Sequence, residues 1–331
     1  MIEIFSGTPE WFFKESLGDG FNYHHFPTDV GIIQLSPFEE DLRETCEQLS
    51  RMYLYGNGLA GRLASQISAA GSKLALCDIS PLGILAASIA GISSVLIENF
   101  TWDWIYAGYF QQEPGLVEIA RSLKSIFDSV SIHIQAEPIC VPKLCNIVAR
   151  PIARRPRQSK EHLRKRLGLP DDHKLILVTG GGIEQQYPGL EGLGDAHDGI
   201  TFVVPGSSRR MRKTRNAILL PHHSGFYHPD LVYASDAVVG KLGYSTIAET
   251  YYAGIPFGYV PREHFRETEP LAGFVKNNLG GFEIGYQEFS SGRWVVQAPR
   301  LLENARQERF HPNGATEVAE YIYEKLLADG Q

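Results

Sequence analysis

Short apolar runs alternate with helix-length segments along the chain, and this alternation constrains the fold most strongly. The runs are rich in Val and Ile, and they are apolar throughout instead of alternating with polar residues. Strands of this kind belong to parallel sheets that are covered on both faces, and parallel strands need long crossover connections. The sequence therefore predicts an α/β fold that is built from βα units.

The expected elements fall into two sets. In the first half we expect strands at Ile2–Ser6, Gly31–Leu35, Lys73–Asp78, Ser94–Glu98 and Ser129–Gln135, and helices at Pro9–Ser16, Phe38–Ser68, Leu82–Ala90 and Leu116–Phe127. In the second half we expect strands at Leu175–Thr179, Thr201–Val204, Ala217–Leu220, Ala237–Lys241 and Phe257–Val260, and helices at Lys160–Leu167, Thr246–Ala253, Leu271–Asn278, Val295–Ala305 and Thr316–Leu327. Two consecutive βα sets predict two domains with a ligand-binding cleft between them.

The boundary between the two sets is marked by prolines and by basic residues. A chain of 331 residues suits two domains. Between Pro142 and Pro170, three prolines and eight basic residues from Arg150 to Arg166 interrupt the periodicity. The basic cluster is either an anion or membrane-surface patch or a solvated linker with an exposed helix face, and we favour the second. We expect the domains to cover residues 1–148 and 149–331.

Composition excludes several functional classes. Thirty-one basic against thirty-eight acidic residues give a net charge of −7, which argues against a general nucleic-acid binder. No apolar run reaches the roughly 18 residues that span a bilayer, and no secretory signal is visible. Four cysteines are too few for a disulfide scaffold. The histidines and cysteines lack the spacing of a metal site, so we expect no bound metal or other cofactor. Without a visible membrane span or secretory signal, we expect a cytoplasmic protein.

The segment from Asp236 to Glu249 is the most informative. A strand ends at Lys241, Gly243 opens a turn, and Ser245 with Thr246 is expected to cap a helix. The first turn of such a helix attracts anions such as phosphate, and Lys241 adds a positive charge. A carboxylate one turn later, at Glu249, can accept both hydroxyls of a ribose. The alternative, a plain turn with a solvated glutamate, stays open at this point.

Two further stretches of the second half carry candidate ligands. Gly180, Gly181 and Gly182 follow a strand, where glycines let a backbone approach a ligand closely, or form an ordinary flexible loop. The loop from Pro261 to Pro270 follows another strand, and its acidic residues either bind sugar hydroxyls or form a hydrophilic surface turn. Two glycine turns at the carboxyl ends of strands favour a nucleoside diphosphate site.

In the first half, polar and aromatic residues follow two neighbouring strands. Asp78 ends one strand, and Asp103 follows the next, so either is a candidate general base. Asp78 could equally cap the following helix. Trp102, Trp104 and Tyr106 could form a platform for a sugar ring, although aromatic residues at this spacing are more often core residues.

With these residues in place, the segment resembles the nucleotide-sugar glycosyltransferases of the GT-B fold. Lys241, Gly243, Tyr244, Ser245, Thr246 and Glu249 match a basic-x-Gly-aromatic-polar-Ser/Thr-x-x-Glu pattern. The chain is similar in particular to the glycosyltransferase-like amino-terminal region of plant L-arabinokinases. Four stretches carry that resemblance: Ser6–Phe13, Asn99–Tyr106, Ala234–Glu249 and Val260–Glu267.

The resemblance implies two Rossmann-like domains that face a central cleft, with the last helix crossing back to the first domain. It implies that the second domain binds a nucleotide-sugar donor and the first an unknown acceptor, with inversion at the transferred sugar and without a metal. By position the diphosphate would contact Gly180, Gly181, Gly182, Lys241, Gly243, Tyr244, Ser245 and Thr246, and the ribose would contact Glu249. Glu267 and Thr268 would bind the donor sugar, although Thr268 replaces the usual Gln. Asn99, Trp102 and Tyr106 would lie on the acceptor side.

One departure from the family is large. Its members open with a strand and a Gly-His-Gly-x-Gly-His turn, whereas Met1 stands close to the position of the family's second strand. We therefore expect the first domain to lack this βα unit and sugar transfer to be impaired. Two alternatives remain: a non-catalytic nucleotide-sugar-binding protein or partner subunit, and a sugar-nucleotide epimerase. The sequence gives no basis for an oligomeric state.

Overall fold

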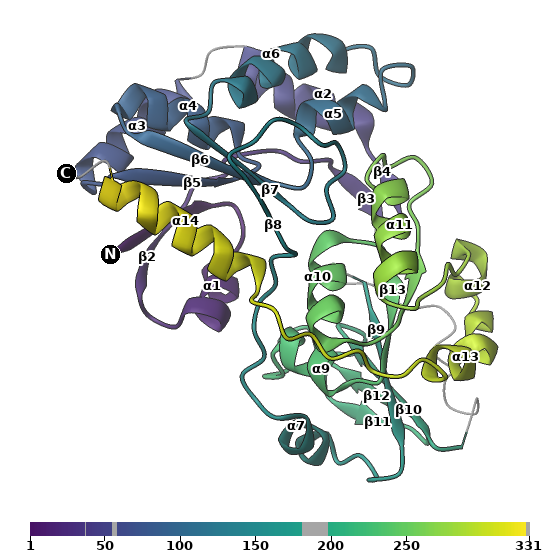
Figure 1. The fold of residues 1–331 in the computed structure, drawn as a ribbon. Helices are drawn as coiled ribbons and strands as arrows, with labels where there is room; N and C mark the ends of the chain where they lie inside the picture. Colours follow the sequence, from purple (N-terminus) through teal and green to yellow (C-terminus); the bar gives the residue numbers. More distant parts are fainter. Residues whose placement is uncertain (37, 55–57, 181–197, 329–331) are drawn as a thin grey trace. The chain divides into compact units, whose positions relative to one another are not determined.

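The computed structural model of the protein describes residues 1–36, 38–54, 58–180 and 198–328, and Figure 1 draws its elements. Its residues form two compact units. The first unit contains Met1–Arg150 and His264–Glu267, and the second contains Pro151–Glu263 and Thr268–Gln331. The mixture of parallel strands and helices in both units confirms the predicted α/β class. The division into an acceptor-side domain of residues 1–148 and a donor-binding domain of residues 149–331 stays a prediction.

The second unit is built on one six-stranded sheet with the order β11-β12-β10-β9-β13-β14. Its strands are β9 (Lys174–Thr179), β10 (Ile200–Pro205), β11 (Arg212–Lys213), β12 (Ala217–Leu220), β13 (Ala237–Lys241) and β14 (Phe257–Val260). Every pair is parallel except β11 with β12. The five parallel strands are apolar and almost wholly buried, which confirms the prediction of strands covered on both faces.

Helices of the second unit follow the strands. They are α7 (Lys160–Leu167), α9 (His228–Ala234), α10 (Tyr244–Ala253), α11 (Thr268–Asn278), α12 (Tyr286–Ser290), α13 (Ala298–Leu302) and α14 (Gly314–Ala328). The single helix expected at Val295–Ala305 is wrong, because a 3-10 helix covers Arg293–Gln297 and α13 begins only at Ala298, with Pro299 in its first turn. The crossing of the last helix to the first domain stays a prediction. No helix within the described residues is both long and apolar enough to cross a membrane.

The first unit contains a four-stranded parallel sheet and two small sheets. The strands β5 (Leu74–Asp78), β6 (Ser93–Glu98), β7 (Ile132–Ala136) and β8 (Ile147–Ala149) pair in that order. Strand β1 (Ile2–Ser6) pairs in parallel with β2 (Phe21–His25), and β3 (Gln34–Ser36) pairs with β4 (Glu39–Glu40). The helices are α1 (Glu10–Leu17), α2 (Leu42–Leu49), α3 (Leu59–Ala69), α4 (Pro81–Ala90), α5 (Trp102–Ala107) and α6 (Leu116–Asp128).

Two predicted elements of the first unit are wrong. The long helix expected at Phe38–Ser68 is divided into α2, a π-helix at Ser50–Leu54 and α3, which begins after Gly58 in the left-handed region. The strand expected at Gly31–Leu35 shrinks to β3, because Gly31 has a positive φ of 64° that no strand contains. Two of these departures, at Gly31 and at Gly58 before α3, occur at glycines with a positive φ.

The segment formed by β1, α1 and β2 has little core of its own. No residue of α1 is buried, and both strands are at most half-buried. Phe5 and Phe26 instead pack against a cluster on α3 and α4 that includes Leu63, Ile67 and Leu82. A two-stranded sheet is marginal alone, so this contact stabilises it. The absence of the family's first strand and glycine-histidine turn stays a prediction.

The close approach of β13 to β9 provides a test of the second sheet. A Cβ at Gly240 would lie 2.0 Å from the carbonyl oxygen of Thr179, whereas a Cβ at Gly273 in α11 would meet no atom within 4 Å. We expect Gly240→Ala to lower the free energy of unfolding by about 1–3 kcal/mol. The matched control Gly273→Ala should raise it by about 0.5–1 kcal/mol, because alanine favours the helix. Denaturant unfolding measures both, and an equal effect of the two substitutions would contradict the close packing.

Candidate functional site

Helix α10 begins at the carboxyl end of β13 without a side-chain cap. The N-cap is Gly243 in an extended conformation, and the helix starts at Tyr244. The expected capping by Ser245 and Thr246 is therefore wrong. Both residues lie within the first turn, after the N-cap. Ser245 is exposed and Thr246 is buried. The first turn thus keeps the positive end of the helix dipole and presents one exposed hydroxyl.

Strands β9 and β13 are neighbours, so the residues that follow them lie at one edge of the sheet. β9 ends at Thr179 and is followed by Gly180, while β13 ends at the half-buried Lys241. The structure therefore brings Gly180 and Lys241 to the same carboxyl edge as the start of α10. Gly181 and Gly182 lie outside the described residues. This edge is where open α/β sheets bind ligands.

Glu249 is buried one turn further along α10, and both of its carboxylate oxygens have partners. Arg154 donates from Nε to Oε1 at 2.9 Å, and the Nδ1 of His228 lies 2.7 Å from Oε2. The glutamate side chain is only 3% exposed. Burial alone would raise its pKa, but the charges and hydrogen bonds of His228 and Arg154 outweigh burial and hold the pKa of Glu249 below its ordinary value.

The contacts of Glu249 join four segments of the second unit. His228 at the start of α9 places its Nε2 3.3 Å from the hydroxyl of Thr179 at the end of β9. Arg154 lies on the segment that enters the unit, and the backbone N–H of Ile152 donates to the Tyr244 hydroxyl at 3.0 Å. The resulting network therefore fixes the entry segment, α9 and β9 around the beginning of α10. Sequence reasoning missed Arg154 and His228 because their partners are distant in the chain.

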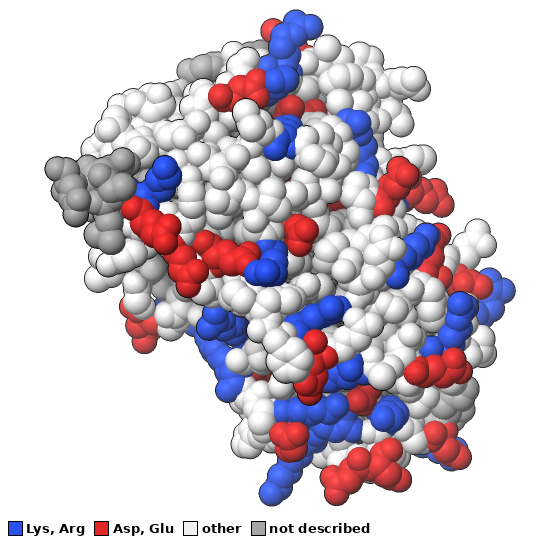
Figure 2. Space-filling model, in the orientation of Figure 1, with Lys and Arg blue, Asp and Glu red and all other residues white. Residues whose placement is uncertain are grey.

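The basic cluster between Arg150 and Arg166 is more ordered than a solvated linker. Lys160 and Arg164 both pair with Asp236, at 2.9 and 3.3 Å, and the Arg157 guanidinium lies over the Tyr227 ring. Figure 2 shows basic side chains gathered over the part of the second unit that contains α7. The predicted helix Lys160–Leu167 has an exposed face with Lys165 and Arg166, whereas Lys160 and Arg164 tie α7 to the unit through Asp236.

Glu267, which was expected at the donor sugar, belongs to the first unit. It is buried, and its Oε1 accepts a hydrogen bond of 3.0 Å from the amide of Asn99. The preceding Phe265 lies in the core of that unit, and Arg266 lies over the Trp104 ring and donates to its carbonyl oxygen. The structure thus brings together two predicted residues, Asn99 and Glu267, that the sequence had assigned to different ligands.

Thr268, the partner expected for Glu267 at the donor sugar, belongs to the second unit. Its hydroxyl donates to the carbonyl oxygen of Arg262 at 2.9 Å, at the start of α11. The side chain therefore stabilises the loop after β14 in the structure as it stands. Its contact with a sugar stays a prediction.

Asp78 ends β5, and the turn that follows it is strained. Ser80 caps α4 by accepting a hydrogen bond from Gly83 N–H at 3.1 Å, so the alternative role of Asp78 as the cap is wrong. Between them, Ile79 has a positive φ of 45°. A β-branched residue rarely adopts this conformation, which other contacts must stabilise. The Ser80 hydroxyl supplies one such contact by donating to the carbonyl oxygen of Thr28 at 3.1 Å.

The loop that receives this bond carries a carboxylate that sequence reasoning missed. Asp29 is half-buried and accepts a 3.2 Å hydrogen bond from the Trp102 indole. Burial raises the pKa of Asp29 to about 6; the nearby charge of Asp78 also raises it, and the indole hydrogen bond opposes both. No spacing marks Asp29 in the sequence, since its partners lie on β5 and α5. A raised carboxyl pKa is common at functional sites.

The remaining predicted residues of the first unit, Trp102, Tyr106 and Asp103, all lie on α5 but differ in burial and contacts. Trp102 stacks on Tyr106 at a centroid distance of 5.7 Å, and Tyr106 is 1% exposed and donates to the carbonyl oxygen of Gly31. Tyr106 is therefore a core residue. Asp103 lies in the first turn of α5 with one buried carboxylate oxygen that has no hydrogen-bond partner within the described part of the chain, and its charge acts on Lys124.

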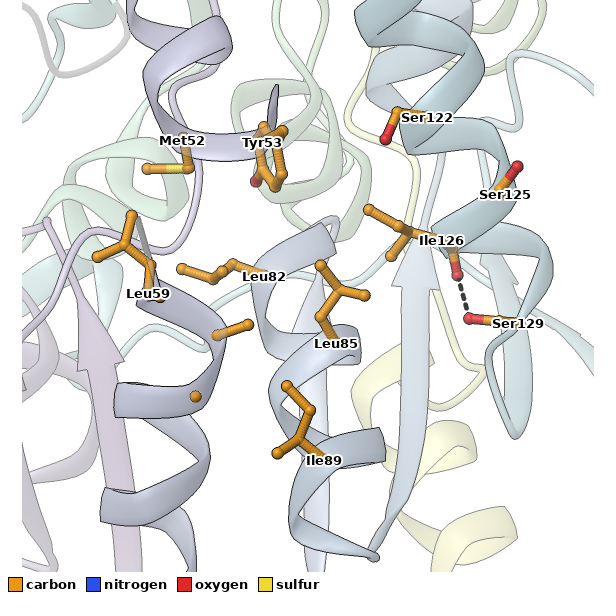
Figure 3. A pocket seen from close by; sticks show the side chains of 13 residues that line it. Met52, Tyr53, Leu59, Leu82, Leu85, Ile89, Ser122, Ser125, Ile126 and Ser129 are labelled. Carbon is orange, nitrogen blue, oxygen red and sulfur yellow. Dashed lines mark hydrogen bonds between the residues drawn. The ribbon is translucent and has the colours of Figure 1, made fainter. Parts of the chain in front are cut away.

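A groove of about 720 Å³ lies elsewhere in the first unit, between α3, α4 and α6 (Figure 3). Apolar side chains, among them Leu59, Leu85 and Ile89, point into it, and Ser122, Ser125 and Ser129 of α6 lie along one side. None of the described residues that line the groove is a predicted site residue. One lining residue, Tyr53, also reaches the loop that follows β2, where its hydroxyl donates to the carbonyl oxygen of Thr28 at 3.4 Å.

The pairing of Glu249 predicts a pH-dependent stability. Because its pKa is lowered in the folded state, Glu249 stabilises the fold above its unfolded pKa of about 4.5, and this stabilisation is lost as the pH falls through the folded pKa. We expect Glu249→Gln to cost about 2–4 kcal/mol at pH 7 and much less near pH 3. Urea unfolding at the two pH values measures this difference.

The exposed Glu303 supplies the control for that experiment. Glu303→Gln should change the free energy of unfolding by less than about 0.5 kcal/mol at either pH. An effect of Glu249→Gln that is equally large at pH 3 and pH 7 would contradict the charge-based origin.

Sequence comparisons with known proteins find two curated relatives that match part of the chain. The chain matches no protein-family model. It is 29% identical over 232 residues to an L-arabinokinase from Arabidopsis thaliana, which covers 68% of this chain and 22% of that protein. It is 26% identical over 181 residues to a UDP-N-acetylglucosamine–N-acetylmuramyl-(pentapeptide) pyrophosphoryl-undecaprenol N-acetylglucosamine transferase from Rhodococcus erythropolis, which covers 49% of this chain and 46% of that protein. The chain therefore spans less than half the length of either relative.

Solved structures of glycosyltransferases show which fold the chain has. Os79 from O. sativa in complex with UDP superposes with a TM-score of 0.59 and 13% identity, covering 97% of this chain and 93% of that one. The spinosyn forosaminyltransferase SpnP superposes with a TM-score of 0.58 and 13% identity, covering 91% and 82%. The glycosyltransferase VinC in complex with dTDP gives 0.56 and 14%, covering 91% and 90%. The chain has the GT-B fold of the nucleotide-sugar glycosyltransferases and resembles part of a plant L-arabinokinase.

Proposed function

We propose that the second unit binds a nucleoside-diphosphate sugar at the carboxyl edge of its sheet, and that the protein transfers the sugar to a hydroxyl acceptor with inversion. The observation that carries the proposal is the uncapped start of α10, where Gly243 and the exposed Ser245 stand beside Lys241. A helix start with backbone N–H groups and a nearby cation suits a diphosphate. The names of the similar structures, which include complexes with UDP and dTDP, support the same ligand class.

The diphosphate site would use the residues at this edge. The first turn of α10, with Gly243, Tyr244, Ser245 and Thr246, would face the phosphates, and Lys241 and the glycines after β9 would flank them. As the donor's anomeric bond breaks, negative charge builds up on the departing diphosphate. The helix dipole and the N–H groups stabilise this charge without a metal, since they are already oriented toward it.

Glu249 is the proposed ribose ligand, and its network shapes that role. A carboxylate has about four acceptor positions, and Arg154 and His228 occupy both oxygens only in part. The contacts with Arg154 and His228 keep Glu249 ionised and hold it in one orientation. A ribose that approaches the helix would then meet a charged, fixed acceptor. Donor-sugar contacts by Glu267 and Thr268 remain part of the proposal, as does an acceptor that contains a hydroxyl.

The protein's location is a separate proposal. Its four cysteines, Cys46, Cys77, Cys140 and Cys145, are unpaired. Free thiols suit a reducing compartment, so we propose the cytoplasm.

Calorimetric titration with UDP, dTDP and GDP tests the donor site. We expect at least one of the three to bind with a Kd below 1 mM, roughly the weakest binding of practical use to an enzyme. Ser245→Ala should weaken that nucleotide about fivefold, because one hydrogen bond to the diphosphate is lost. The exposed Ser125 of α6 gives the control, and Ser125→Ala should leave the affinity unchanged. Failure of all three nucleotides to bind at millimolar concentration would refute the proposal.

A further inference from the structure

We propose that Asp29 is the general base that removes the proton from the acceptor hydroxyl, with Asp78 as a second carboxylate beside it; this assignment rests on the proposed glycosyl transfer. Asp29 lies on the loop between β2 and β3, and Asp78 lies at the carboxyl end of β5. The hydrogen bond from the Ser80 hydroxyl to the carbonyl oxygen of Thr28 ties the two segments together.

The loop around Asp29 is held rigidly by the core of the first unit. Besides Ser80, the Tyr53 hydroxyl reaches the carbonyl oxygen of Thr28 at 3.4 Å, and the Tyr106 hydroxyl reaches that of Gly31 at 2.7 Å. Val30 and Ile32 pack against the core cluster. The Trp102 indole binds Oδ2 of Asp29 at 3.2 Å, which orients the carboxylate and leaves Oδ1 to accept a proton. A general base has to be fixed in this way to act on a bound hydroxyl.

The surroundings of Asp29 favour proton transfer near neutral pH. The titratable groups that interact with its carboxylate are Asp78, Tyr53 and Tyr106, and none of them supplies a positive charge. Burial and Asp78 bring the pKa of Asp29 to about 6, which makes it a stronger base than an exposed aspartate yet leaves it ionised at pH 7. A purely structural carboxylate would gain nothing from such an environment, which costs stability.

The strained turn at Ile79 points the same way. Ile79, with its left-handed backbone, stands between Asp78 and Ser80, so the carboxylate and the hydroxyl that binds Thr28 flank the strained residue in one turn. Strain of this kind persists where the surrounding contacts impose it, and it gathers at functional sites.

In the proposed step, the acceptor's O–H proton moves to the Asp29 carboxylate. The acceptor oxygen forms a bond to the anomeric carbon of the donor. The bond from that carbon to the diphosphate oxygen breaks, and the nucleoside diphosphate leaves with the electron pair. Asp29 then returns its proton to solvent.

The test compares Asp29→Asn, Asp29→Glu and the exposed control Asp128→Asn in the full chain. The glucose conjugate of whichever nucleotide binds in the calorimetric titration serves as donor, with water and then free pentoses and hexoses as acceptors. We expect Asp29→Asn to bind the nucleotide as the wild type does but to release sugar at least about 100-fold more slowly. Asp29→Glu should recover part of the rate, and Asp128→Asn should match the wild type.

Two further readouts separate a base from a structural residue. The wild-type rate should rise with pH through about 6, and Asp78→Asn should move this rise to lower pH by removing the neighbouring negative charge. Because the folded pKa is raised, ionised Asp29 destabilises the fold above its unfolded pKa, and this cost is complete above pH 6. Asp29→Asn should therefore raise the melting temperature at pH 7 but not at pH 4.

The outcomes are distinct. Normal sugar release by Asp29→Asn, or a melting temperature at pH 7 that falls together with the activity, would overturn the assignment. Nucleotide binding by a wild type that releases no sugar would also overturn it and leave the donor site standing. If the wild type binds no nucleotide, the proposed function itself fails.

Discussion

The buried carboxylate of Glu249 is the contact on which the second unit's candidate site depends. A buried glutamate is unfavourable unless ion pairs or hydrogen bonds compensate it, and here Arg154 and His228 supply these contacts from two other segments. Because His228 also reaches Thr179, the same interaction connects α10, α9 and β9 at the carboxyl edge of the sheet. The start of α10 is consequently fixed with respect to the strand that precedes Gly180.

The two units treat their buried acids in opposite ways. In the second unit, His228 and Arg154 lower the pKa of Glu249 against the effect of burial, so the fold gains stability from an ionised acceptor. In the first unit, burial and a like charge raise the pKa of Asp29, so the fold loses stability by keeping it. A group that binds neutral hydroxyls profits from permanent ionisation, whereas a group that exchanges a proton needs a pKa close to the working pH. The two environments therefore fit the two different roles proposed for these residues.

The sequence predicted local features well where one segment determined them. Strands β12, β13 and β14 have the predicted bounds, because each is a short apolar run between turn residues. The α/β class and the resemblance to the GT-B glycosyltransferases are confirmed for the same reason, since the pattern from Lys241 to Glu249 lies within a single strand-turn-helix unit. The prediction that Ser245 caps α10 was wrong, because Gly243 is the N-cap residue in an extended conformation and Ser245 lies inside the first turn.

Contacts between distant segments could not be predicted in this way. Asp29 carries no motif, and its proposed role depends on Trp102, 73 residues away, and on Asp78 at the end of β5. Glu267 is expected at the donor sugar from its place after β14, and its contact with Asn99 could not be predicted from that place. The four-residue stretch that contains Glu267 packs into the first unit, where Glu267 accepts a hydrogen bond from Asn99. A loop can leave one sheet and contribute its side chains to another core, because apolar residues such as Phe265 determine where it packs. The position of a residue after a strand therefore identifies the sheet edge that a loop leaves, while the burial of its apolar neighbours decides which core the loop packs against.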